Sequence, residues 1–200
     1  MDPNPQISSI YQIKSITDKL NLQDLFVKQQ PFEVELGTGD GNFLFQYATA
    51  HPNINFIGVE RLLGRLRKLD KKAVRYGLQN LRLLRIEALY FLQYLLPDSS
   101  IQALHIYFPD PWPKKKHHKK RLINDRFPQI ASRVLQPTGY IHIKTDDRSY
   151  YDQIIQCFEP HKCFQPVPQP KEIVDALTDF ERDFLAVGKP IYRITYQYLI

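Results

Sequence analysis

The sequence is poor in the features that mark secreted, membrane-spanning or metal-binding chains. It contains two cysteines, Cys157 and Cys163, and a single histidine lies near them. These are too few ligands for a zinc site, and one pair does not make the disulfide framework of a small secreted domain. No segment reaches the roughly 18 apolar residues of a membrane span, and the N-terminus lacks a basic segment followed by an apolar one. We therefore expect inert thiols, no bound metal, and a soluble, cytoplasmic protein without a membrane partner.

The length and the composition fit a single folded domain. The chain has 200 residues, of which 43% are apolar and 12% aromatic, and it contains no internal repeat. Such a chain can bury one full core and leaves little for a second. Residues 1–17 are polar, contain proline and are weakly patterned, so we expect an N-terminal arm there and a single domain over residues 18–200. Residues 160–170 are rich in proline and are also expected to be loop-like.

The excess of positive charge is concentrated in one run. Lysine and arginine together number 27 and the acids 21, which gives a net charge of +6. Six cations fall within residues 114–121, so the remaining chain is neutral and the sequence predicts one basic patch. A neutral body with one focused cationic segment favours a polyanion bound at one place. The alternative is a solvated or disordered tail, but this run directly follows a predicted strand and precedes a predicted helix.

Short apolar segments alternate with helical patterns along the chain. Strands are predicted at residues 31–36, 54–60, 81–87, 101–108, 139–145 and 190–200. Helices are predicted at residues 42–50, 61–77, 88–96, 124–135, 148–158 and 178–188, with Gly77 as the residue that ends the second of them. This alternation is typical of an α/β fold in which a mostly parallel sheet carries helices on both faces.

A glycine turn follows the first of these strands. Gly37, Gly39 and Gly41 resemble the dinucleotide fingerprint G-x-G-x-x-G, but the third glycine comes one residue early. Glu35 precedes the turn by two residues, and a carboxylate there would repel a pyrophosphate. It would instead favour a ligand that carries an ammonium and a sulfonium, as S-adenosylmethionine does.

Two further acids end the second and the third predicted strands. Glu60 is placed to accept hydrogen bonds from both hydroxyls of a ribose, as the acid after the glycine turn does in dinucleotide folds. Glu87 is placed to accept from an adenine amino group. Acids at strand ends also cap the helices that follow or face solvent. Taken together with Glu35 and the glycines, the pattern favours the ligand.

Asp110 lies in a stiff turn immediately before the basic run. Pro109 and Pro111 flank it, and each proline fixes its own φ near −65° and removes a backbone donor. A carboxylate held rigidly at the end of a central strand lies where open α/β sheets bind their ligands. The single tryptophan, Trp112, can stack on an unstacked base or pack against the core, and the sequence leaves both open.

The segments VELGTGDG, GVE, RIEA, FPDPWPKKKHHKKR, IHIKTD and TDFE, in this order, resemble the tRNA (guanine-N7)-methyltransferase family over residues 31–192. PDPW followed by a basic run is close to diagnostic of that family. The resemblance implies a Rossmann-like class I methyltransferase fold with S-adenosylmethionine as the methyl donor. It also implies that the acceptor is N7 of a guanosine in the variable loop of tRNA, at position 46 of the tRNA.

The resemblance also assigns roles to individual residues. It implies that Asp110 is catalytic and that the cofactor contacts Glu35, Gly37, Gly39, Gly41, Glu60, Glu87 and Asp110. Family members often carry Asp at the position of Glu87. The residues implied in substrate binding are Lys114, Asp146, Thr178, Asp179, Phe180 and Glu181. The residues expected to bind RNA are Lys115, Lys116, His117, His118, Lys119, Lys120 and Arg121.

Some of these residues have structural interpretations that the sequence leaves open. Thr178 and Glu181 form a T-x-x-E pattern, which is a capping box for the helix that follows. Asp146 can be the N-cap of the helix that begins near Asp147.

Guanine N7 carries an in-plane lone pair, so its methylation needs no base to remove a proton. We expect catalysis by positioning and electrostatics. Asp110 can accept a hydrogen bond from the guanine edge and stabilise the positive charge that forms there, which is an interaction stronger in the transition state. It is the catalytic residue in that limited sense.

The sequence leaves three alternatives and one open question. A base amino-group methyltransferase would carry two prolines between its acid and its aromatic residue, whereas one proline separates Asp110 from Trp112. A noncatalytic RNA-binding protein that keeps the fold would not bind S-adenosylmethionine. An NAD-dependent oxidoreductase is disfavoured by the acid before the glycine turn. The protein can be a monomer or a homodimer.

Overall fold

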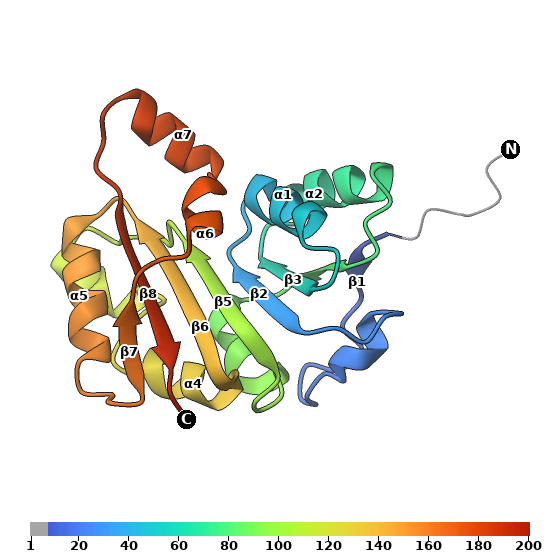
Figure 1. Cartoon of the computed structure of the whole chain (residues 1–200), viewed down its shortest axis with the longest axis horizontal. Helices are drawn as coiled ribbons and strands as arrows, with labels where there is room; N and C mark the ends of the chain where they lie inside the picture. Colours follow the sequence, from blue (N-terminus) through green and yellow to red (C-terminus); the bar gives the residue numbers. More distant parts are fainter. Residues whose placement is uncertain (1–7) are drawn as a thin grey trace, which may run out of the picture.

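The computed structural model describes residues 8–200, and within them eight strands form one sheet. The order of the strands is β1-β4-β3-β2-β5-β6-β8-β7 (Figure 1). All pairs from β1 to β6 are parallel, and β8 runs antiparallel to both β6 and β7. The predicted α/β class is confirmed. The strands are β1 (Ile10–Tyr11), β2 (Phe32–Leu36), β3 (Asn55–Glu60), β4 (Leu81–Arg85), β5 (Ile101–Tyr107), β6 (Leu135–Thr145), β7 (Phe164–Val167) and β8 (Tyr192–Tyr198).

Helices connect the strands and cover both faces of the sheet. The α-helices are α1 (Asn42–Ala50), α2 (Leu63–Arg75), α3 (Ala88–Tyr90), α4 (Phe127–Val134), α5 (Arg148–Phe158), α6 (Lys171–Asp175) and α7 (Asp179–Ala186). The shorter elements are η1 (Leu22–Leu25), the π-helical turn η2 (Phe91–Leu95) and the 3₁₀ segment η3 (Lys115–Lys120). No helix within residues 8–200 is long and apolar enough to cross a membrane.

Successive residues of the central strands alternate between two hydrophobic clusters, as a pleated strand requires. On β3, Phe56 packs on the side of α1 and α2, while Ile57 packs on the side of η2, α4 and α5. On β2, Val34 belongs to the same cluster as Ile57, on the side of η2, α4 and α5. Glu33 and Glu35 therefore lie on the α1 face of the sheet, and both are buried there.

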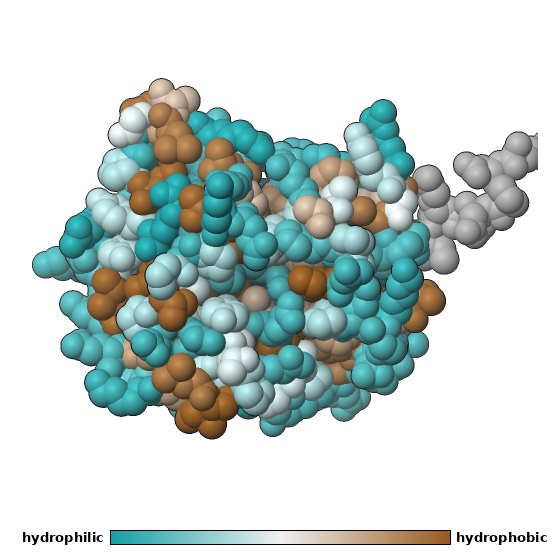
Figure 2. Space-filling view, viewed as in Figure 1, coloured by the Kyte–Doolittle hydropathy of each residue, from teal (hydrophilic) through white to brown (hydrophobic). Residues whose placement is uncertain are grey.

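Helices α6 and α7 lie beyond the carboxyl ends of β5 and β6, across from α1 (Figure 1). Hydrophobic residues gather on the surface at this end of the molecule (Figure 2). Phe180, Leu185 and Val187 of this region are all at least half exposed. Helices α6 and α7, which carry exposed apolar side chains, thus border the carboxyl ends of β5 and β6.

Two segments expected to be loop-like contain strands, so that expectation is wrong for residues 10–11 and 164–167. Ile10 and Tyr11 pair with Leu83 and Leu84 at one edge of the sheet, and β7 pairs with β8 at the other. A strand this short has too few residues to show an alternating pattern. Residues 1–7 of the predicted arm lie outside the described residues, and the boundary at residue 18 stays a prediction.

Helix α2 is amphipathic, with its apolar side on the sheet and its cations outward. Leu66, Leu69 and Ala73 are fully buried. The helix ends at Arg75, and Gly77, directly after the C-cap residue Tyr76, has φ +66° and donates its amide to the Val74 carbonyl. This confirms Gly77 as the predicted ending residue, since the left-handed region is open to glycine.

Candidate active site

A pocket of about 240 Å³ lies at the carboxyl ends of β2 and β5. It is bounded by the glycine turn, the start of α1, the end of β5 and the start of α7. Its position matches the place where open α/β sheets bind ligands. Its lining comprises Glu35, Gly37, Thr38, Gly39, Asp40, Gly41, Asn42, Phe43, Arg65, Tyr107, Phe108, Thr178, Asp179, Phe180 and Asp183.

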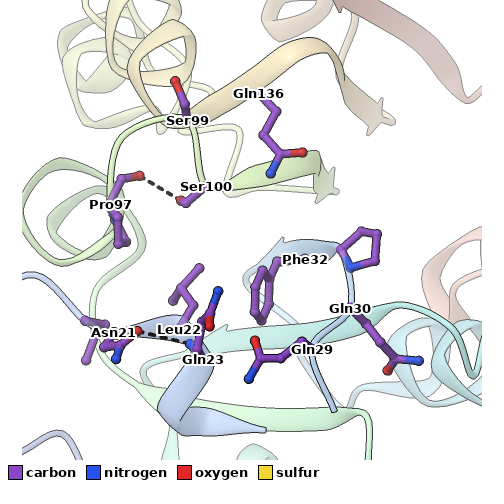
Figure 3. Close-up of a pocket in the computed structure, with 12 residues that line it drawn as sticks. Asn21, Leu22, Gln23, Gln29, Gln30, Phe32, Pro97, Ser99, Ser100 and Gln136 are labelled. Atoms are coloured by element: carbon purple, nitrogen blue, oxygen red, sulfur yellow. Dashed lines mark hydrogen bonds between the residues drawn. The ribbon is translucent and has the colours of Figure 1, made fainter.

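A second, larger cleft of about 490 Å³ lies at the amino end of β2 (Figure 3). It is lined by residues 20–23 and 29–32, by Pro97, Ser99 and Ser100, and by Gln136, and none of these is charged. None of the predicted site residues reaches it. The smaller pocket, which contains seven of them, is therefore the candidate active site.

The glycine turn brings bare backbone to the wall of the pocket. Gly37 and Gly39 have φ angles of +77° and +55°, which L side chains rarely adopt. A Cβ at Gly37 would meet nothing within 4 Å, and one at Gly39 only Arg65, at 3.9 Å. Both positions thus face open space that a bound molecule can occupy at close range.

Glu35 is a buried carboxyl without a partner. Only 3% of its surface is exposed, and its Oε2 makes no hydrogen bond to any residue within 8–200. Burial raises its pKa well above the usual 4.5, the negative charge of Glu60 adds to this, and Lys144 opposes it. A buried polar atom without a hydrogen bond is costly. The pocket can therefore accept a cationic group at this position.

Glu60 links the glycine turn to the start of α2. Its Oε1 accepts from the amides of Arg61 and Leu62, at 2.7 and 2.9 Å. Its Oε2 accepts from the amide of Gly39, at 3.1 Å, and Arg65 lies 3.9 Å away. The carboxylate thus lies beside the pocket and orients the backbone of the glycine turn.

Glu87 adopts the capping arrangement that the sequence left open. Its two carboxylate oxygens accept from the amides of Leu89 and Tyr90, at 3.0 and 2.7 Å, at the start of α3. It does not line the pocket. Its role toward an adenine stays a prediction.

Asp110 is exposed in a loop whose ends are anchored. Phe108, which lines the pocket, has φ +50°, and its amide bonds to the Lys144 carbonyl at 2.8 Å. Trp112 has φ +43°. Non-glycine residues in the left-handed region are uncommon and persist where surrounding contacts hold them. The loop therefore presents the Asp110 carboxylate to solvent two residues beyond the pocket wall.

Arg121 was expected to bind RNA, but the structure gives this no support, because the fold encloses its side chain. The residue is 1% exposed, and its guanidinium donates to the Pro111 carbonyl, to Ser149 Oγ and to Gln153 Oε1, at 2.7, 2.7 and 2.8 Å. It also lies over the Tyr150 ring. A guanidinium enclosed in this way has no face for a phosphate. Arg121 instead ties the loop of Asp110 to α5.

The five lysines of the basic run face solvent. They are Lys114, Lys115, Lys116, Lys119 and Lys120, and none of them forms an ion pair with a residue of the described chain. His117 and His118 are half-buried, and His118 Nε2 is enclosed without a partner within residues 8–200. Trp112 is half-buried between the His117 ring and Lys120 Nζ. The accessible charge of the run is thus carried by its lysines.

The start of α7 contributes three predicted substrate residues to the pocket, and a fourth lies elsewhere. Thr178, Asp179 and Phe180 line the pocket. Glu181 is fully buried and forms ion pairs with Lys144 and Arg193, at 2.9 and 3.1 Å. It also completes the capping box with Thr178, as the structural interpretation predicted. Glu181 is thus enclosed by the fold, and its substrate role stays a prediction.

Asp146 is not the N-cap of α5. The cap is Asp147, whose carboxylate accepts from the Tyr150 amide at 2.7 Å. Asp146 pairs instead with Lys189, which precedes β8. Its substrate role stays a prediction.

A polar layer on the α1 face of the sheet was not predicted. His105 Nε2 lies 2.7 Å from Glu33 Oε2, and His105 Nδ1 lies 2.8 Å from the hydroxyl of Tyr107, which lines the pocket. Lys144 is also fully buried there. The alternation in residues 139–145 places His142 and Lys144 on one face of the sheet, and this pattern could have indicated a polar layer there.

Several solved structures with similar folds are methyltransferases. A 16S rRNA methyltransferase, KamB, superposes with a TM-score of 0.63 at 15% identity, over 92% of this chain and 94% of that one. SMU.1697c, a putative methyltransferase from Streptococcus mutans in complex with SAH, superposes with a TM-score of 0.56 at 13% identity, over 87% and 92%. These likenesses show that the fold is that of the class I methyltransferases.

Proteins with similar sequences identify the family within the methyltransferases. Residues 29–194 match a family described as "Putative methyltransferase". A tRNA (guanine-N(7)-)-methyltransferase of Chromohalobacter salexigens is 36% identical, over 88% of this chain and 74% of its own length. That of Enterococcus faecalis is 32% identical over 86% and 82%, and that of Thermotoga maritima 34% over 88% and 56%. The chain belongs to the tRNA (guanine-N7-)-methyltransferase family.

Proposed function

We propose that this protein transfers a methyl group from S-adenosylmethionine to N7 of a guanosine in the variable loop of tRNA. One observation carries the proposal. A pocket with an unpartnered buried carboxyl and bare glycine backbone adjoins an exposed aspartate and a row of exposed lysines. The pocket suits a cationic cofactor and the lysines suit a polyanion, so donor and acceptor would meet beside Asp110.

The residues of the pocket fit the cofactor. Glu35 offers an unsatisfied carboxyl oxygen to an ammonium group, and the open backbone at Gly37 and Gly39 allows close approach. Glu60 lies beside the turn, where its carboxylate can exchange a backbone amide for ribose hydroxyls. When bound, S-adenosylmethionine supplies a methyl group whose bond to sulfur breaks as guanine N7 donates its lone pair.

The chain's own contribution to this reaction is positioning and charge. No proton has to leave N7, so a general base is not required. The Asp110 carboxylate accepts from an N–H of the guanine edge and holds the base in line with the pocket. Positive charge then develops on the guanine ring, and the attraction between Asp110 and the ring grows in the transition state.

The exposed lysines of η3 and Lys114 hold the RNA. Each lysine that contacts a phosphate releases a counterion, so log affinity falls linearly with log salt. Three to five contacts give a slope of roughly −2 to −4. The contact is independent of sequence, so the choice of nucleotide rests with the Asp110 loop.

The decisive experiment is incubation of the protein with unmodified tRNA and methyl-labelled S-adenosylmethionine, followed by mapping of the labelled nucleotide. The expected product is N7-methylguanosine in the variable loop. Label on an exocyclic amine of adenine or cytosine would identify a base amino-group methyltransferase. Absence of cofactor binding would identify a noncatalytic RNA-binding protein. The cytoplasmic location and the monomeric or homodimeric state stay predictions.

Replacing Lys114 and Lys115 together by alanine is expected to weaken tRNA binding more than it slows turnover of bound tRNA. Both side chains are exposed, so the fold should be unaffected. Loss of two phosphate contacts reduces the salt slope by about 1.5 to 2. The measurement is the apparent affinity for tRNA across a salt series, beside single-turnover rates at saturating tRNA.

The matched control is the double variant Lys28→Ala/Lys162→Ala. Both lysines are exposed and precede strands β2 and β7, so they lie at the opposite end of the sheet from the pocket. The control should keep the wild-type slope. Unchanged affinity in the Lys114/Lys115 variant would move the RNA site away from η3.

A further inference from the structure

A second row of cations lies on the outer face of α2. Arg67, Lys71 and Arg75 are spaced four residues apart, which places them in one line along the helix. All three are exposed. We call these three residues the α2 stripe.

The stripe makes no ion pair within the described part of the chain. The neighbouring cations of α2 differ, because they contact the wall of the pocket. Arg65 lies near Glu60, and Lys68 pairs with Asp40 at 3.0 Å. Lys72 donates to Asn42 at 2.6 Å. The helix thus has one row of cations that supports the glycine turn and a second row that faces outward.

The one acid within α2, Asp70, forms hydrogen bonds with residues outside the helix. Asp70 accepts from the amide of Ser9 and the hydroxyl of Ser8, at 2.6 and 3.0 Å, so it anchors the start of β1. Like charges four residues apart destabilise a helix. Arg75 lies in the last turn, where the helix dipole favours a cation, but no described residue offsets the repulsion between Arg67 and Lys71, which is the condition expected of a surface that meets an external anion.

The net charge of the chain does not indicate this second cationic surface. Residues 61–75 contain seven cations and one acid, but acids in other segments cancel them in the sum. The prediction of a single basic patch is therefore wrong. A total charge carries no information about position, whereas the structure separates the α2 stripe from the acids that balance it.

The stripe and η3 lie on opposite sides of the pocket. Helix α2 packs on β3 and β4, and η3 follows β5. In the sheet, β4 is three places from β5, and adjacent strands lie about 4.8 Å apart, so about 14 Å separates these strands. Helix α2 begins beyond the carboxyl end of β3, so its first two turns, which include Arg67, lie at the end of the sheet that holds the pocket, and a nucleic acid that crosses the mouth of the pocket can contact both η3 and this part of the stripe.

We infer that the α2 stripe binds the sugar-phosphate backbone of a segment of tRNA away from the nucleotide that is methylated. This rests on the proposed function, since the same RNA would occupy η3 and the pocket. The partner is a polyanion because the stripe offers three exposed cations, one of which, Arg75, lies over the ring of the exposed Tyr76. The contact adds affinity and orientation and takes no part in the chemistry.

The test is the double variant Arg67→Gln/Lys71→Gln, since glutamine keeps the helix propensity of the residues that it replaces. We expect the salt slope for unmodified tRNA to fall by about 1.5 to 2. KM for tRNA should rise about tenfold at moderate salt while kcat stays unchanged. Affinity for S-adenosylmethionine should be unchanged, and Tm should be equal or higher because like charges are removed.

The matched control is Lys28→Gln/Lys162→Gln, which removes two exposed cations from the opposite end of the sheet. It should keep the wild-type slope. An unchanged slope in the α2 variant, with a reduced slope in the Lys114/Lys115 variant, would overturn the inference and leave the proposed function standing. Stripe-dependent binding to vesicles of anionic phospholipid without a change in the tRNA slope would also overturn it. Failure of the wild-type protein to bind or methylate tRNA would overturn the proposed function itself.

Discussion

Replacement of Asp110 by alanine is expected to reduce methylation of tRNA by about 10²-fold or more, the magnitude seen when one preorganised electrostatic partner of a transition state is removed. The affinity for S-adenosylmethionine should stay within a fewfold, because Asp110 lies outside the pocket lining. The loop itself should keep its shape, since Phe108 and Arg121 anchor it through backbone contacts. Single-turnover rates and cofactor titration check the two parts separately.

Two further variants separate the charge of Asp110 from its place in the fold. Asp110→Asn keeps the shape and an acceptor oxygen but loses the negative charge, so its activity should fall nearly as far if charge stabilisation dominates. Asp152→Ala removes an exposed carboxylate that pairs with Arg148 on α5, and it should retain activity. Near wild-type turnover in Asp110→Ala would refute the mechanism.

Replacement of Glu35 by glutamine is expected to change cofactor affinity and stability in opposite directions. Loss of the carboxylate removes a charged partner of the ammonium group, which is worth about 1.5–3 kcal/mol, or roughly 10- to 150-fold in Kd. In the cofactor-free protein the same change replaces a buried carboxyl, whose charged form is disfavoured by burial, with an amide that does not ionise. The free energy of unfolding should therefore rise at neutral pH, by about 1 kcal/mol or more.

The pH dependence gives this prediction a definite sign. The pKa of Glu35 is raised in the folded protein, mainly by burial, from a usual value of 4.5. Above pH 4.5 the unfolded chain loses this proton while the folded protein retains it, so the contribution of Glu35 to stability falls as pH rises. Denaturant unfolding of the cofactor-free protein at pH 5 and pH 8 should show a larger gain from Glu35→Gln at pH 8.

Glu33→Gln is the matched control on the same strand and the same face. Glu33 accepts hydrogen bonds from Gln102 and lies 2.7 Å from His105 Nε2, and the His105 contacts help to lower its pKa below the usual value against the effect of burial. Its replacement should destabilise the protein by about 1–3 kcal/mol, because a buried network loses its charged member. A stabilising Glu33→Gln, or a Glu35→Gln with unchanged cofactor affinity, would contradict this account of the two acids.

The main features of the site could be predicted because they depend on local covalent geometry. The prolines beside Asp110 restrict the backbone there, and the glycines at 37 and 39 allow positive φ angles beside the pocket. The alternation of apolar residues likewise determines which segments become strands, since their side chains must alternate between two faces. These constraints act within a few residues and are visible in the sequence.

The roles of several charged residues could not be predicted, because they depend on contacts between distant segments. The spacing of Thr178 and Glu181 predicted their capping box, but not that Glu181 would also pair with Lys144 and Arg193 and be buried between them. Arg121 belongs to the basic run by sequence, yet it points inward because Ser149 and Gln153 of α5 enclose it. Neither burial follows from neighbours along the chain.

The sequence by itself determined the α/β class, the glycine turn, the stiff loop of Asp110 and the membership of the family. Only the tertiary structure decided which charges are accessible: the lysines of η3 and the α2 stripe face solvent, while Arg121 and Glu181 do not. The physical reason is that backbone preferences are local, whereas burial and ion pairing depend on which segments the sheet brings together. For the PDPW loop and its basic run, this leaves the lysines as the groups proposed to bind RNA and makes Arg121 the residue that anchors the loop.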